Sequence, residues 1–234
     1  MRIGGGSGAP SRRGCLTLHP VPPNLPPPHP DPLPPKGRRG KALDAAPPMP
    51  TEIAAWRDGG EPVWVFAYGS LLWDGGLPTA AAEPALLRGY HRSFCLYSYD
   101  YRGTAARPGL TLGLDHGGSC RGAVLRLPAD ALDRVWQREM SGRLVYDGRV
   151  LRVVTATDTR QALAFTALRS CADYAGRLSL DEAARLILGA AGRRGTCREY
   201  FENTMRHLEQ LGLADRPLCR LAERVRALAL HDGV

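Results

Sequence analysis

Residues 62–73 read Pro-Val-Trp-Val-Phe-Ala-Tyr-Gly-Ser-Leu-Leu-Trp, and this stretch indicates how the middle of the chain is built. Its first part is a short apolar, β-prone run, which predicts a buried strand that ends in a turn at Gly69-Ser70. Glycine permits close backbone approach, and consecutive N–H groups at a turn form a nest that binds anions. Taken alone, such a tetrapeptide is typical of ordinary turns.

The pattern after this stretch predicts a mixed sheet followed by helices. We expect strands at about 86–98, 109–114 and 120–127, separated by glycine-rich turns such as Gly117-Gly118, a helix from Pro128 to about Met140, and further strands at 149–157 and 161–168. Because strands come first and helices last, the fold class is α+β, with helices packed on a curved mixed sheet or β-barrel.

The last third of the chain carries helix signals. Ser179 and Glu182 form a capping-box pattern that predicts a helix through Gly189. A second helix is expected from about Cys197 to Leu211, ending at Gly212, and a third from Asp215 to about Leu230.

The first part of the chain has a different composition. Of the 20 prolines, 14 lie in residues 1–50, and this stretch carries +5 of the net charge of +8. Too few apolar side chains are present to offset the entropy of ordering, so we expect residues 1–60 to be disordered and residues 61–234 to form one catalytic domain. Met49 is an alternative start of the protein.

Composition also limits the partners and the compartment. The basic excess lies mostly on the tail and no basic-aromatic platform is evident, so no nucleic-acid binding is expected of the domain. The six cysteines are scattered without CxxC pairs, which predicts neither a zinc site nor a disulfide framework. No apolar run is long enough to insert in a membrane, so we expect a cytoplasmic protein without metal or cofactor, of unknown oligomeric state.

One acidic residue lies on the apolar face of the helix that follows Pro128. Glu139 is seven residues after Leu132, in a stripe that also contains Val135 and Trp136, while Arg138 is expected to point elsewhere. Burial of a carboxylate raises its pKa, which suits proton transfer near neutral pH. The alternative is that Glu139 marks where the helix leaves the core.

Several segments together resemble the ChaC family of glutathione-specific γ-glutamylcyclotransferases. Residues 65–73 resemble its signature strand and loop, and Arg138-Glu139-Met140 resembles its Arg-Glu motif. The other matching segments, in chain order, are 88–94, 102–104 with Pro108-Gly109, 117–122, 174–178 and 199–204. Two departures are Ala67, where a glycine is common, and Ala105-Ala106, which replaces Pro-Glu.

The resemblance implies a γ-glutamylcyclotransferase-like fold, a catalytic role and a substrate. Glutathione would be cyclised to 5-oxoproline with release of Cys-Gly, without a cofactor or metal, and Glu139 would be the general base and acid. The residues implied in substrate binding are Val65, Phe66, Ala67, Tyr68, Gly69, Ser70, Leu71 and Tyr200. Tyr200 is equally explained as a packed aromatic, and Arg92 and Arg102 either bind a substrate carboxylate or form structural ion pairs.

Two other functions fit the same residues. A cyclotransferase of this fold can act on other γ-glutamyl amino acids or amines, although the Leu-Trp continuation after Tyr-Gly-Ser favours glutathione within the resemblance. A non-enzymatic regulator of cation transport is the second alternative, and the intact Glu139 argues against it.

Overall fold

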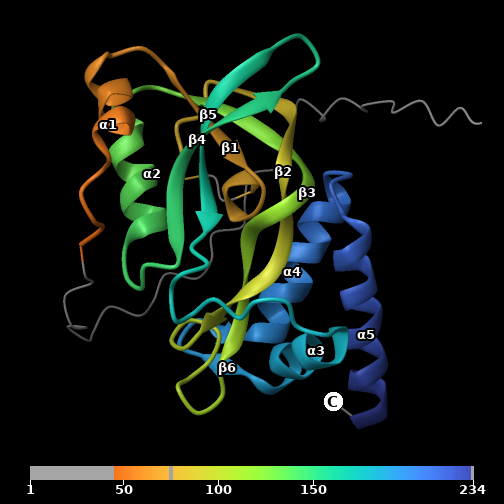
Figure 1. The fold of residues 1–234 in the computed structure, drawn as a ribbon. Coiled ribbons are helices and arrows are strands. Elements are labelled where there is room, and N and C mark those ends of the chain that lie inside the picture. Colours follow the sequence, from red (N-terminus) through yellow and green to blue (C-terminus); the bar gives the residue numbers. More distant parts are fainter. Residues whose placement is uncertain (1–44, 74–75, 233–234) are drawn as a thin grey trace, which may run out of the picture.

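Five strands of the chain close into a barrel in the computed structural model, which describes residues 45–73 and 76–232 (Figure 1). Around the barrel the strand order is β1-β3-β2-β4-β5, and β1 and β5 close it as a parallel pair at Val65 and Leu163. The strands are β1 (Val63–Ala67), β2 (Ala81–Ser98), β3 (Gly109–Leu127), β4 (Tyr146–Val154) and β5 (Thr159–Ala167). The predicted α+β fold with a curved sheet or barrel is confirmed.

Strand β1 is buried on both faces, as its continuous apolar run predicted. It pairs with β3 over its whole length, from Val63 opposite Leu127 to Ala67 opposite Ala123. Val65, Phe66 and Ala67 are 0% exposed. The turn that follows β1 therefore begins at a fully buried, paired strand end.

The glycine pair Gly117-Gly118 does not form the expected turn. Both residues have positive φ values, 107° and 70°, but they lie inside the 19-residue strand β3. Strand β2 pairs with β3 on both sides of them, and the register shifts between Arg88 and Tyr90. The glycines bend a long hairpin strand at a bulge instead of reversing the chain, because both halves of β3 keep the same partner.

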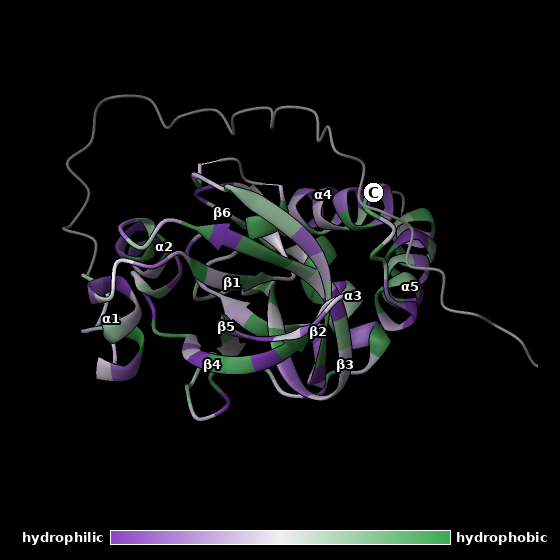
Figure 2. Ribbon diagram, turned by 90° about the horizontal axis from the view of Figure 1, so that it is seen from above, coloured by the Kyte–Doolittle hydropathy of each residue, from purple (hydrophilic) through white to green (hydrophobic). Residues whose placement is uncertain are grey.

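Helices cover the barrel on two sides (Figures 1 and 2). On one side are α1 (Thr51–Asp58) and α2 (Ala131–Met140), and on the other are α3 (Leu180–Gly189), α4 (Cys197–Gln210) and α5 (Arg216–Asp232). The short elements η1 (Ser70–Leu72), β6 (Ala191–Gly192) and β7 (Gly195–Thr196) complete the assignment. Capping boxes at Ser179 and Thr196 begin α3 and α4, and the first was predicted.

The prediction of disorder through residue 60 is wrong for residues 45–60. Helix α1 occupies part of this range, and its Ile53 is 0% exposed in the core beside α2. Trp136 Nε1 donates a hydrogen bond of 2.8 Å to the Pro47 carbonyl. The proline-rich composition of residues 1–50 led to the prediction of disorder, because it does not reveal these few apolar contacts. Residues 1–44 lie outside the described part of the chain.

The Trp136 side chain of helix α2, three residues before Glu139, packs directly on strand β4 at Gly148. A Cβ atom at Gly148 would lie 2.4 Å from Trp136 Cζ3, so the indole occupies the space that a side chain would need. Leu132 and Val135 are 0% exposed on the same face. The helix ends at Met140, one residue after Glu139.

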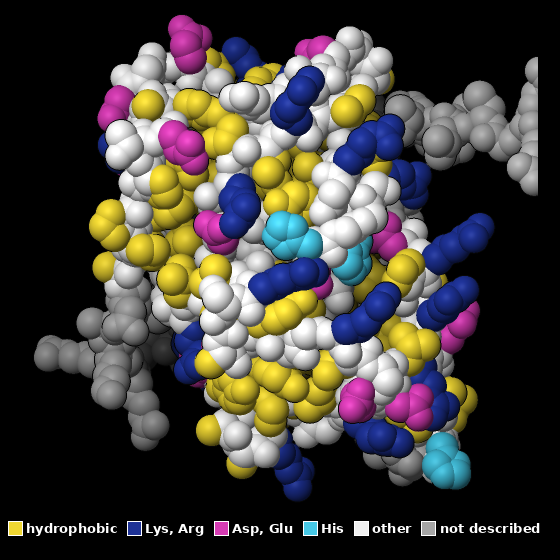
Figure 3. All heavy atoms as spheres, viewed as in Figure 1, with side chains coloured by type: hydrophobic (Ala, Val, Ile, Leu, Met, Phe, Trp, Pro, Cys, Tyr) yellow, Lys and Arg dark blue, Asp and Glu magenta, His cyan; other side chains and the backbone are white. Residues whose placement is uncertain are grey.

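The surface carries charges of both signs. On the face drawn in Figure 3, arginine side chains are interspersed with acidic and apolar ones. Among the described helices, none is both long and apolar enough to cross a membrane. The five described cysteines are free thiols, and burial raises the pKa of Cys95 and Cys120 to about 12.

Candidate active site

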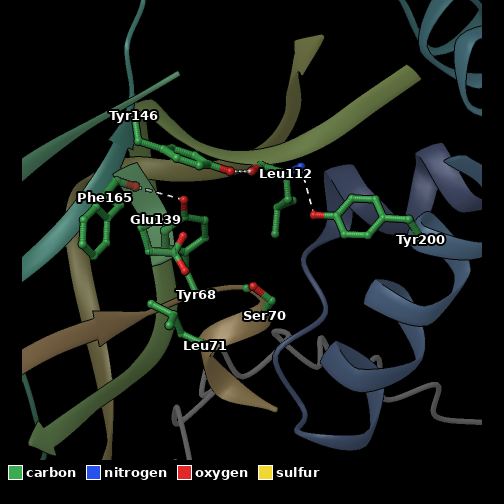
Figure 4. A pocket seen from close by; sticks show the side chains of 9 residues that line it. Tyr68, Ser70, Leu71, Leu112, Glu139, Tyr146, Phe165 and Tyr200 are labelled. Carbon is green, nitrogen blue, oxygen red and sulfur yellow. Dashed lines mark hydrogen bonds between the residues drawn. The ribbon is translucent and has the colours of Figure 1, made fainter. Parts of the chain in front are cut away.

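A hollow with about 350 Å³ of empty volume, its open mouth included, lies where the turn after β1 meets α2 and α4 (Figure 4). Its lining comes from six separate parts of the chain. The lining residues are Tyr68, Gly69, Ser70 and Leu71 after β1, Leu112 of β3, Glu139 of α2, Tyr146 of β4, Phe165 of β5 and Tyr200 of α4.

Glu139 brings a carboxylate to this hollow. Its side chain is 15% exposed, and its Oε1 accepts a hydrogen bond of 2.9 Å from Arg138 Nε. Arg138 Nη2 also donates to Ser70 Oγ, at 3.0 Å. The expectation that Arg138 points elsewhere is therefore wrong, because its long side chain folds back at the end of α2 and joins the carboxylate to the turn.

Two phenols complete the barrel side of the hollow, Tyr68 buried and Tyr146 half-buried. Tyr68 Oη donates to the Phe165 carbonyl and Tyr146 Oη donates to the Leu112 carbonyl, each at 2.9 Å (Figure 4). Burial raises the pKa of both hydroxyls well above 10, and the negative charge of Glu139 acts in the same direction. The two phenols are therefore neutral at physiological pH.

Tyr200 brings a third phenol from helix α4. Its hydroxyl accepts a hydrogen bond of 3.4 Å from the Leu112 N–H, and burial raises its pKa. The Arg102 guanidinium lies 5.2 Å from the centre of the Tyr200 ring, and Arg102 Nη1 donates to the Arg194 carbonyl. Tyr200 lines the hollow as predicted, and Arg102 is held by the backbone of the β6–β7 connection.

The turn itself is fixed at both ends. Gly69 precedes the short 3₁₀ helix η1, and a Cβ atom there would lie 3.1 Å from Leu112 Cδ2. Beyond η1, the Trp73 ring stacks on His207 of α4, with centroids 4.7 Å apart. The first N–H groups of a helix have no partner within it, so this segment offers backbone donors at the hollow.

The structure brings together some of the predicted residues and excludes others. Tyr68, Gly69, Ser70, Leu71, Glu139 and Tyr200 all line the hollow. Val65, Phe66 and Ala67 are 0% exposed and do not line it, so their predicted contact with substrate is not supported. They support the turn from beneath as the last residues of β1.

Sequence reasoning missed three lining residues. Leu112 was expected in a strand, but alternation alone does not separate a pocket residue from a core residue. Tyr146 begins β4, three residues before the expected strand. Phe165 is 1% exposed and contributes the carbonyl that holds Tyr68. Only the closure of the barrel brings these positions together.

The fold and the site define a class of protein. Two solved structures of a γ-glutamyl cyclotransferase specific to glutathione from yeast have the same fold, with TM-scores of 0.64 and 0.65. They are 20% and 19% identical to this chain, cover 71% and 72% of it, and are themselves covered over 96% and 99% of their length. The barrel with its flanking helices is therefore the γ-glutamylcyclotransferase fold.

The chain belongs to the ChaC-like protein family, whose sequence profile matches residues 63–228. It is 33% identical over 180 residues to the glutathione-specific gamma-glutamylcyclotransferase of Escherichia coli (strain K12), covering 74% of this chain and 78% of the relative. It is 31% identical over 176 residues to gamma-glutamylcyclotransferase 2-3 of Arabidopsis thaliana, covering 70% of this chain and 88% of that protein.

Proposed function

We propose that this protein degrades glutathione to 5-oxoproline and Cys-Gly by intramolecular cyclisation. The observation that carries the proposal is the position of Glu139, whose carboxylate faces a hollow lined by three phenols and the Tyr68–Leu71 turn. Membership of the ChaC-like family supports the reaction type. The relatives named for glutathione support the choice of substrate.

The reaction needs a proton carrier. The α-amine of the γ-glutamyl group attacks its own γ-carbonyl carbon, so a C–N bond forms and the carbonyl oxygen becomes an oxyanion. The bond to the cysteine nitrogen then breaks, and that nitrogen takes up a proton. In all, the attacking nitrogen loses two protons as it changes from ammonium to lactam N–H, and the leaving nitrogen gains two as it changes from amide N–H to ammonium. Glu139 accepts each proton from the attacking nitrogen and passes it to the leaving nitrogen, so the reaction needs no water and no second carboxylate.

The other lining groups bind and orient. Backbone N–H groups and Ser70 Oγ at the turn after β1 hold the α-carboxylate and the developing oxyanion. Arg138 fixes the Glu139 carboxylate relative to Ser70 through its two hydrogen bonds. The rings of Tyr68, Tyr146 and Tyr200 restrict the γ-glutamyl chain so that the amine and the carbonyl meet.

The cytoplasm is the compartment that we propose for this activity. Glutathione is kept reduced there, and the described cysteines of this protein are free thiols.

Incubation with reduced glutathione, beside γ-glutamyl-alanine, tests the proposal. We expect 5-oxoproline and Cys-Gly from glutathione, at a kcat/KM at least about tenfold above that for γ-glutamyl-alanine, as a site that binds the Cys-Gly portion would give. Faster cyclisation of γ-glutamyl-alanine would contradict the substrate assignment. No 5-oxoproline from either compound would contradict the reaction itself.

A further inference from the structure

The buried side chain of Arg92 is hydrogen-bonded to the turn that follows β1, on the side of the turn away from the hollow. Arg92 lies on β2 opposite Leu114, and its side chain is 0% exposed. It does not line the hollow. A buried guanidinium is stabilised only when its N–H groups meet acceptors, so the partners of Arg92 indicate its role.

The Arg92 guanidinium reaches acceptors in three parts of the fold. Its Nε donates to the Tyr68 carbonyl at 2.7 Å, and Nη2 donates to the Arg121 carbonyl of β3. Nη1 donates to the Leu213 carbonyl at 3.1 Å and to Asp215 Oδ2, which lies just before α5. Every nitrogen of the guanidinium has an acceptor within the protein, which excludes the role of substrate-carboxylate ligand that the sequence left open.

The bond to the Tyr68 carbonyl fixes the direction of one peptide group. The peptide from Tyr68 to Gly69 is trans, as are all peptides of the described residues, so its C=O and N–H point in opposite directions. The carbonyl faces the buried Arg92, and Gly69 lines the hollow. The Gly69 N–H therefore points away from Arg92.

We infer that Arg92 is a positioning residue that aims the Gly69 N–H into the hollow as the donor for the oxyanion of the cyclisation. The inference rests on the proposed function. The positively charged Arg92 guanidinium, bonded to the Tyr68 carbonyl, also polarises the peptide group and makes its N–H a stronger donor. Arginine suits the position because its planar fork satisfies acceptors in several directions, which a lysine ammonium at the same place does not reproduce.

The variant Arg92→Lys tests the inference through kcat and KM. It keeps the charge but loses the fork, so the peptide is no longer held. We expect kcat for glutathione to fall about 100-fold, the loss known for removal of one oxyanion donor, with KM changed by less than about threefold. A folded Arg92→Lys protein with wild-type kcat would overturn the inference.

A second variant covers the case in which Arg92→Lys does not fold. Asp215→Asn keeps Arg92 and removes the charge of its partner, whose side chain is 24% exposed. We expect kcat to fall about fivefold to tenfold, again with little change in KM. The matched control is Arg224→Ala. It removes the ion pair between α5, the helix that follows Asp215, and Asp181 of α3, and it should leave kcat unchanged. An unchanged kcat in Asp215→Asn, or an equal loss in Arg224→Ala, would refute the positioning role.

Nuclear magnetic resonance of the free protein gives a readout that needs no turnover. The carbonyl ¹³C shift of Tyr68 and the amide ¹⁵N shift of Gly69 should change in Asp215→Asn and in folded Arg92→Lys, and stay at wild-type values in Arg224→Ala. Unchanged shifts in the first two variants would overturn the inference whatever the enzyme's substrate. Altered shifts in a protein whose wild type does not cyclise glutathione would refute the proposed function and leave the positioning of the peptide intact.

Discussion

Two carboxylates of this protein have similar burial and similar partners, yet only one lies at the hollow. The Glu139 side chain is 15% exposed and is bonded to Arg138, which also bonds the Ser70 hydroxyl. The Asp115 side chain is 10% exposed and accepts hydrogen bonds from Arg169 Nε at 2.7 Å and Tyr174 Oη at 2.9 Å. Each carboxylate is thus bonded to one guanidinium, Glu139 to that of Arg138 and Asp115 to that of Arg169.

The difference lies in what the carboxylate faces. Both Asp115 oxygens are engaged, since Oδ1 also accepts from the His116 N–H at 2.8 Å, and the residue is absent from the lining of the hollow. Its partners join β3 to the segment after β5, so the cluster ties two parts of the barrel together. Glu139 faces open volume beside three phenols. Burial beside an arginine therefore does not separate the two carboxylates, whereas a position in the lining of the hollow does.

Removal of the charge from Glu139 should give the largest effect. Glu139→Gln keeps the shape of the side chain and its place on α2 but takes up no proton. We expect kcat for glutathione cyclisation to fall by ~10²–10⁴-fold, the usual contribution of a general acid-base group, with little change in the free energy of unfolding. The measurement is 5-oxoproline release together with denaturant unfolding.

The matching change at the other carboxylate is Asp115→Asn, which should affect stability instead of catalysis. It replaces charge-assisted hydrogen bonds from Arg169 by neutral ones and should lower the free energy of unfolding by about 2 kcal/mol. Turnover per folded molecule should stay at the wild-type level. A loss of turnover as large as that in Glu139→Gln would remove the distinction between the two clusters.

The contrast also shows how far sequence reasoning reaches. Periodicity placed Glu139 on the inner face of α2, because that face is set by residues within three turns of one helix. The capping box at Ser179 and the strand β1 were found for the same local reason. Arg138, Tyr146 and Leu112 were missed, because their proximity depends on the closure of the barrel and on the direction of a long side chain.

The helix α1 and the bulge in β3 were missed for a related reason. Ile53 is the one buried residue of helix α1, and its burial depends on a surface that α2 provides. Gly117 and Gly118 have the positive φ that turns use, but the pairing partner of the strand decided between a turn and a bulge. The Gly117-Gly118 dipeptide alone does not encode this long-range pairing.

A smaller effect is expected at the hydroxyl that Arg138 bonds. Ser70→Ala removes the acceptor at 3.0 Å from Arg138 Nη2 and a donor at the turn. We expect KM for glutathione to rise about tenfold and kcat to fall less, as for loss of one polar contact to the substrate. The matched variant Tyr174→Phe removes the hydroxyl beside Asp115 and should leave both constants unchanged. An unchanged KM in Ser70→Ala would argue against contact between Ser70 and the substrate.

The smallest effect concerns the pH dependence of the stability that Asp115 contributes. Burial opposes ionisation of this carboxyl, but hydrogen bonds from Arg169 and Tyr174 outweigh it and lower its pKa below the usual 3.8. The folded state therefore holds its proton less tightly than the unfolded state, so the stabilisation is present above pH 3.8 and is lost as pH falls through the folded-state pKa. The stability difference between the wild type and Asp115→Asn should accordingly shrink as pH is lowered from about 5 to about 2.5. Urea unfolding across that range measures it, and a difference that stays constant would show that the carboxylate of Asp115 contributes nothing through its charge.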